Sequence, residues 1–119
     1  MVGIHGFAHQ IIPVPTSMLQ YSFIIPVITI APIVAIVMLW RNLVDTGITL
    51  LFGSMLGALV FGVYNHFILI SPDHVSQIPA TSWGKVFQIT AVLLVISETL
   101  GVGVGLWRFR KKRKLEKIH

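Results

Sequence analysis

Lys85 to His119 reads KVFQITAVLLVISETLGVGVGLWRFRKKRKLEKIH, an apolar run that ends at Trp107 and a block of Lys and Arg directly after it. Seven of the nine basic residues in the 119-residue chain lie within positions 108–119. Membrane spans end in this way on the cytoplasmic side, because short loops and tails rich in Lys and Arg are retained there. The stretch therefore predicts a membrane span followed by a basic cytoplasmic tail, residues 108–119.

The composition of the rest of the chain agrees with this interpretation. Hydrophobic residues make up 55% of the chain, charged residues only 11%, and the mean hydropathy is +0.84. A soluble domain of this size would need a more strongly charged surface. We therefore expect one membrane domain over residues 1–119, in the cell (plasma) membrane.

Three uncharged or nearly uncharged runs are long enough to cross a bilayer as helices, since about 20 apolar residues span the hydrocarbon core. They cover residues 21–40, 48–70 and 85–107. Each should be helical through the core, because lipid cannot satisfy backbone hydrogen bonds, and Pro26 and Pro32 are expected to kink the first. The predicted fold is all-α, with three transmembrane spans, the N-terminus outside and the C-terminus cytoplasmic.

The net charge of +5 is concentrated in the tail beside the membrane. Each basic residue there gains about 1 kcal/mol from anionic lipid headgroups, so we expect a lipid partner and no nucleic acid. The chain has no cysteine, which excludes disulfides and thiolate metal sites.

Glycine pairs in the last two spans predict where helices pack closely. Gly53 and Gly57 form one GxxxG pattern, and Gly101 and Gly105 form another. Such small residues let membrane helices approach one another. Antiparallel packing would place the two patterns at similar depth and facing each other, with Gly62 extending the face. The alternative is that glycine is simply common in membrane helices and marks no pairing.

Glu98 is the acidic residue near the middle of the third span. An ionisable side chain there costs about 2.5–3.5 kcal/mol on insertion scales, so it should face protein. It shares a helix face with Gly101 and Gly105, and Ser54 is expected at comparable depth. One interpretation is a protonated carboxyl that hydrogen-bonds Ser54 or a partner subunit. The other is proton or cation movement, for which the sequence shows no second titratable group at that level.

Histidines gather on the predicted outer side. Imidazole and carboxylate groups in this position suit copper or zinc, although no tight ligand motif is present and interfacial histidines are often only amphipathic surface residues. Interhelical hydrogen bonds, worth around 0.6 kcal/mol each, are another use for Asn65, His66 and Gln88. The candidate metal ligands are His5, His9, His66, Asp73 and His74.

The stretch Gly57 to Val75, GALVFGVYNHFILISPDHV, and the Trp83–Trp107 span with its basic tail are similar to small three-span proteins of unassigned function. In size, histidine-bearing outer side and lysine-rich tail, the chain also resembles the small accessory transmembrane subunits of the archaeal ammonia monooxygenase complex. That resemblance implies a structural subunit beside a copper enzyme whose catalytic ligands lie in other chains.

No catalytic constellation, phosphate-binding loop or cofactor fingerprint is present in the sequence, so we expect no enzyme activity from the chain itself. The expected function is that of an accessory or structural subunit, packed against itself as a homo-oligomer or against larger membrane subunits. The alternative is a small transport or metal-handling protein that uses Glu98 or the outer histidines.

Overall fold

The computed structural model describes residues 2–12 and 15–118, and all the regular elements in those ranges are helices. Three helices are long and apolar enough to cross a membrane: Met18–Trp40, Val44–Ile68 and Ser82–Glu116. The prediction of three helices long and apolar enough to cross a membrane is therefore confirmed. In chain order the elements are α1 (Val2–Ile11), α2 (Met18–Phe23), the π-helix η1 (Ile24–Ile30), α3 (Ala31–Trp40), α4 (Val44–Val63), the π-helix η2 (Tyr64–Ile68), the short 3₁₀ helix η3 (Val75–Gln77) and α5 (Ser82–Glu116).

The helices begin earlier than predicted, and the third also ends later. Ser17 caps α2 through a bond from Gln20 N–H to its hydroxyl, and Thr81 caps α5 by accepting from Gly84 N–H. Such caps satisfy amide donors at the start of a helix. Because the capping residues precede the purely apolar run, each helix begins before that run. The third helix continues through the basic block, because Lys and Arg are good helix formers.

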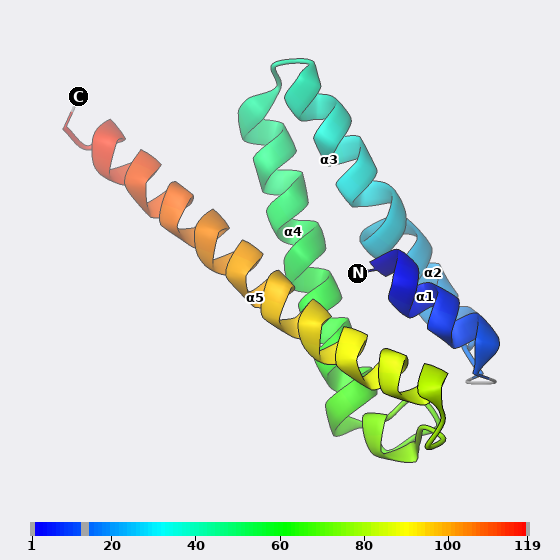
Figure 1. Cartoon of the computed structure of the whole chain (residues 1–119). Helices are drawn as coiled ribbons and strands as arrows, with labels where there is room; N and C mark the ends of the chain where they lie inside the picture. The colour runs from blue at the N-terminus through cyan, green and yellow to red at the C-terminus, as the bar shows by residue number, and fades with distance from the viewer. Residues whose placement is uncertain (1, 13–14, 119) are drawn as a thin grey trace.

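Successive long helices run antiparallel (Figure 1). The turn between α3 and α4 has Asn42 at a φ of 60°, a left-handed conformation that asparagine tolerates better than most residues. At the same end, Lys112 Nζ on α5 lies 2.8 Å from Asp45 Oδ2 on α4. The basic tail and the α3–α4 turn therefore occupy one end of the bundle, which we call the tail end.

Helix α1 was not predicted from the sequence. It lies alongside the first turns of α5 (Figure 1). Its Ala8 and the following residue Ile12 are buried in one cluster with Phe87 and Ile78. Its position places the N-terminal histidines beside α5 instead of on an exposed leader. We call this end of the bundle, where α5 begins, the histidine end.

The predicted glycine pairing is not the one observed. A Cβ built on Gly101 would meet Met55, and one on Gly105 would meet Phe52, so this face does pack on α4 but against large side chains. On α4, Gly57 instead approaches the first span, where a Cβ would lie 2.9 Å from Val27 Cγ1. Cβ atoms on Gly53 or Gly62 would meet nothing within 4 Å. The two glycine patterns thus serve different neighbours, because α4 lies between two helices and turns its small residues toward only one.

Candidate metal centre

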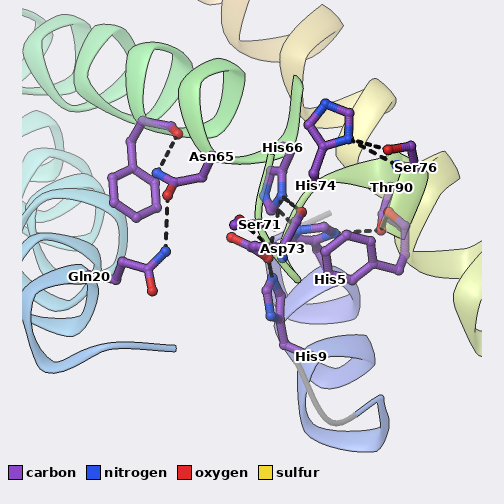
Figure 2. Close-up of polar contacts among 12 residues, drawn as sticks. His5, His9, Gln20, Asn65, His66, Ser71, Asp73, His74, Ser76 and Thr90 are labelled. Carbon is purple, nitrogen blue, oxygen red and sulfur yellow. Dashed lines mark hydrogen bonds and ion pairs between the residues drawn. The ribbon is translucent and has the colours of Figure 1, made fainter. Parts of the chain in front are cut away.

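Three histidine side chains converge at the histidine end. His5 and His9 lie one turn apart on α1, so both point from the same face of that helix, and His66 comes from η2. Each offers one ring nitrogen, and these nitrogens lie within 4.8 Å of one another. Figure 2 shows the three rings gathered beside Asp73, which belongs to the loop after η2. We call His5, His9 and His66 the histidine cluster.

The hydrogen bonds of His5 fix which of its nitrogens carries the proton. Its Nδ1 lies 2.8 Å from Thr90 Oγ1. The single hydroxyl proton of Thr90 is directed to the carbonyls of Val86 and Phe87, at 2.7 and 3.0 Å, and a carbonyl can only accept. His5 Nδ1–H is therefore the donor to Thr90, which leaves a lone pair on His5 Nε2.

The hydrogen bond of His66 likewise assigns its proton. Its Nδ1 lies 3.0 Å from the backbone carbonyl of Asp73, so Nδ1–H donates and Nε2 carries a lone pair. The Nε2 atoms of His5 and His66 are 3.2 Å apart. Two lone pairs that face each other at this distance repel unless a cation lies between them.

Two further buried polar atoms in this place have no hydrogen-bond partner among the described residues: His9 Nδ1 and Asp73 Oδ1. His9 Nε2 lies 3.4 Å from Asp73 Oδ1, and His66 Nδ1 lies 3.5 Å from it. Leaving a buried polar atom unpaired costs about 1–3 kcal/mol. Such atoms in a native fold call for an explanation, and a bound ion is one of the usual ones.

The surroundings of His5 and His9 keep these two imidazoles neutral. Burial, together with the nearby His66 and His9, lowers the pKa of His5 to about 3. Burial, together with His66, lowers the pKa of His9 to about 4. Burial raises the pKa of Asp73 above its ordinary value, opposed by His66. Near neutral pH the His5 and His9 lone pairs are therefore free, as metal binding requires.

The geometry suits a tetrahedral metal ion. Nitrogen ligands bound to zinc at about 2.0–2.1 Å lie about 3.3–3.4 Å from each other, close to the 3.2 Å between His5 Nε2 and His66 Nε2. The other spacings are at most 4.8 Å, so a side-chain movement of about 1 Å would bring all three nitrogens to one ion. Thr90 holds the far side of the His5 ring and the backbone carbonyl of Asp73 holds that of His66, as outer partners of metal-bound histidines commonly do.

A cavity of about 170 Å³ extends from the histidine cluster toward the middle of the bundle. His5, His9, His66 and Asp73 line one part of it, and Glu98 of α5 also lines it. Apolar residues of η1, α4 and α5 make up much of the remaining wall, among them Ile24, Ile28, Ala58, Phe61, Leu94 and Val95.

The remaining predicted polar residues lie elsewhere or have other partners. His74 is outside the cluster and contacts Ser76 and the carbonyl of Phe67. Asn65 accepts from Gln20 Nε2 at 3.0 Å and so joins the first two spans, whereas Gln88 donates to Val75 O in the loop. Ser54 bonds the first span instead of approaching Glu98.

Thr90 was missed by sequence reasoning. Threonine in a membrane helix commonly bonds its own backbone, and its second role as acceptor from His5 depends on a contact across 85 residues. The i, i+4 spacing of His5 and His9 was the available signal for the two ligands of α1.

No protein-family model, curated protein or solved structure matches the chain. The functional conclusion therefore depends on the geometry of the site.

Proposed function

We propose that this chain is a membrane-embedded metal-binding protein, with one zinc or copper ion held by His5, His9 and His66. The observation that carries the proposal is the 3.2 Å approach of His5 Nε2 to His66 Nε2, two nitrogens whose Nδ1 partners in the same rings face Thr90 and the carbonyl of Asp73. A cation between them removes the repulsion.

The choice of zinc or copper follows from the donor atoms. Three imidazoles with no thiolate suit zinc and copper(II) better than the hard cations magnesium and calcium, which prefer oxygen. Three protein ligands also leave a fourth position on a tetrahedral ion. The fourth ligand can come from the cavity, which suits exchange of the ion or of a small ligand better than a closed structural site.

The experiment is a binding titration of the full chain in lipid nanodiscs, with Zn²⁺ followed by calorimetry, Co²⁺ by its visible bands and Cu²⁺ by electron paramagnetic resonance. We expect one ion per chain and nitrogen coordination. His9→Gln removes a ligand whose Nδ1 makes no hydrogen bond, so the variant should fold and lose more than about 100-fold in affinity, since even outer-partner mutations cost 10–100-fold.

His74→Gln is the matched control. It removes a histidine that follows Asp73 in the loop but does not belong to the histidine cluster. It should bind like the unmodified protein. Equal losses in the His9 and His74 variants, or no stoichiometric binding at all, would refute the proposal. Comparison of the Zn²⁺ and Cu²⁺ titrations identifies which metal binds more tightly.

We further propose that the protein lies in the plasma membrane with its tail end in the cytoplasm. The support is the positive-inside rule, applied to a tail and an Arg41 turn that share one end of the bundle. The histidine cluster then faces the extracytoplasmic side.

A role as accessory subunit of a larger membrane complex is the second candidate. Gly53 and Gly62 favour it, because Cβ atoms there would meet nothing within 4 Å and such positions let another helix approach closely. The resemblance to accessory subunits of archaeal ammonia monooxygenase has the same implication. Purification in mild detergent followed by mass spectrometry of co-purifying chains tests it, and Gly53→Leu should reduce their recovery.

A further inference from the structure

Glu98 shares the cavity with the histidine cluster, although the two lie far apart along α5. Thr90, the partner of His5, precedes Glu98 by eight residues, which corresponds to about 12 Å along the helix axis. The cavity therefore connects a site suited to a divalent cation with a carboxyl group deeper in the bundle. The inference that follows rests on the proposed metal binding.

The Glu98 side chain has no protein partner among the described residues. It is 9% exposed, and no hydrogen bond or ion pair joins its carboxyl to residues 2–12 or 15–118. Ile24, Ile28 and Val95 are among the apolar residues that line the cavity with it. An ionised carboxylate in such surroundings is strongly disfavoured unless a positive charge compensates it.

Between Glu98 and the tail end, α5 packs closely against α4. On the same face of α5, Gly101 is covered by Met55 and Gly105 by Phe52. The cavity instead includes polar residues of the histidine end. The cavity therefore gives a proton a path between Glu98 and the histidine cluster.

We propose that Glu98 is a proton-binding site linked to the metal centre, so that metal binding drives release of the Glu98 proton and the cavity exchanges one cation for the other. The carboxylic acid becomes a carboxylate, and its proton passes along the cavity to bulk water. The carboxylate then offsets part of the charge of the bound ion. This gives Glu98 a chemical role that does not require a protein ligand.

The size of the linkage follows from Coulomb's law. A divalent ion about 12 Å away, at an effective dielectric constant of about 20–40, changes the proton affinity of a carboxyl about 10- to 100-fold. Linkage is reciprocal, so ionised Glu98 strengthens metal binding by the same factor. The other titratable side chains that face this cavity come from α1, α2, η2 and the following loop: His5, His9, Tyr21, His66 and Asp73.

The test is calorimetry of Zn²⁺ binding in nanodiscs, between pH 5.5 and 8, in buffers of different ionisation enthalpy. This design counts the protons released per ion bound. Glu98→Gln should release fewer protons than the unmodified chain, by up to one at the pH where Glu98 is protonated before binding. Above that pH the variant should bind Zn²⁺ about 10- to 100-fold more weakly.

Two variants keep the result interpretable. Glu98→Asp retains a carboxyl and should retain the proton release, which separates loss of the acid from a local packing defect. Glu116→Gln makes the same chemical change in the exposed tail and should behave like the unmodified chain. Identical proton counts and affinities for Glu98→Gln and the unmodified chain, across the pH range, would overturn the linkage while leaving the metal site intact. Absence of both Zn²⁺ and Cu²⁺ binding to the unmodified chain would overturn both proposals.

Discussion

The hydroxyl of Ser54 donates a 2.7 Å hydrogen bond to the backbone carbonyl of Val27, which lies in the π-helix of the first span. In that segment Ala31 N–H bonds to Pro26 O, five residues back. The same pattern would pair Val27 O with residue 32, but Pro32 has no N–H. Ser54 thus supplies, from the second span, the donor that the first span lacks.

This relationship predicts a specific double-mutant result. Ser54→Ala should lower the free energy of unfolding by about 0.6–1 kcal/mol, because the Val27 carbonyl is left without a donor. In a Pro32→Ala background a backbone N–H becomes available, so the same Ser54 change should cost clearly less. Unfolding of the four variants in mixed micelles measures the coupling. Purely additive effects would mean that Pro32 does not create the need for Ser54.

Gly57 and Gly53 should respond differently to leucine. A side chain at Gly57 meets Val27 and Phe23, whereas one at Gly53 meets nothing within 4 Å. Gly57→Leu should destabilise the isolated chain by about 1–3 kcal/mol through overpacking, and Gly53→Leu should change it by less than about 0.5 kcal/mol. The comparison is made by unfolding in micelles. Similar losses at both positions would contradict the packing of α4 against the first span.

The orientation is open to chemical labelling. Cysteines introduced one at a time at Ser76 and Ile118, in a chain with no native cysteine, report on the two ends of the bundle. The positive-inside rule predicts that an impermeant thiol reagent labels the Ser76 variant in intact cells, whereas the Ile118 variant reacts only after lysis. The reversed pattern would place the histidine cluster in the cytoplasm.

Much of the architecture could be predicted from the sequence, because hydrophobic run length directly reflects bilayer thickness. The partners of individual residues could not. In a membrane helix both the lipid-facing and the protein-facing sides are apolar, so periodicity does not show that Gly57 packs on the first span while Gly101 packs on Met55. Hydropathy likewise gave no reason to expect α1 to fold back along α5.

The candidate metal centre was only partly predictable for the same reason. The predicted outer side of the membrane is the reason to expect candidate ligands at His5, His9, His66 and Asp73. The structure brings these four side chains together. His74, equally plausible from sequence, lies outside the cluster because its ring bonds within its own loop. Local loop hydrogen bonds decide that difference, and sequence position does not reveal them.

Thr90 should act as a positioning residue for His5. Thr90→Val keeps the shape but removes the acceptor of His5 Nδ1–H, which should lower Zn²⁺ affinity about 10- to 100-fold. Thr90→Ser keeps the hydroxyl and should restore most of it. Circular dichroism of both variants checks that the helices remain. A valine variant with unchanged affinity would mean that another group holds the His5 ring.

Docking of α1 should weaken in acid when no metal is present. An undocked α1 would bind protons on His5 and His9 below their ordinary pKa of 6.5, whereas the docked rings resist protonation until about pH 3 and 4. The stabilisation is therefore complete above pH 6.5 and declines as the pH falls toward 4, by at most about 1.4 kcal/mol per pH unit for each ring. The raised pKa of Asp73 acts in the opposite direction.

Hydrogen–deuterium exchange of residues 2–12, corrected for the intrinsic effect of pH, measures this docking. We expect less protection at pH 5 than at pH 7.5, and a smaller change in His9→Gln. Protection that increases on acidification would contradict neutral, buried imidazoles.

The contact between His5 and Thr90 also sets an order of events during biosynthesis. The two residues are 85 positions apart. His5 and His9 therefore leave the ribosome long before α5, the helix that they contact. Until the last span is inserted, α1 has neither Phe87 nor Thr90 to pack against, so these contacts cannot hold His5 and His9 beside His66. Binding of the proposed metal ion would consequently be a late step of maturation, open only to chains whose third helix has been inserted.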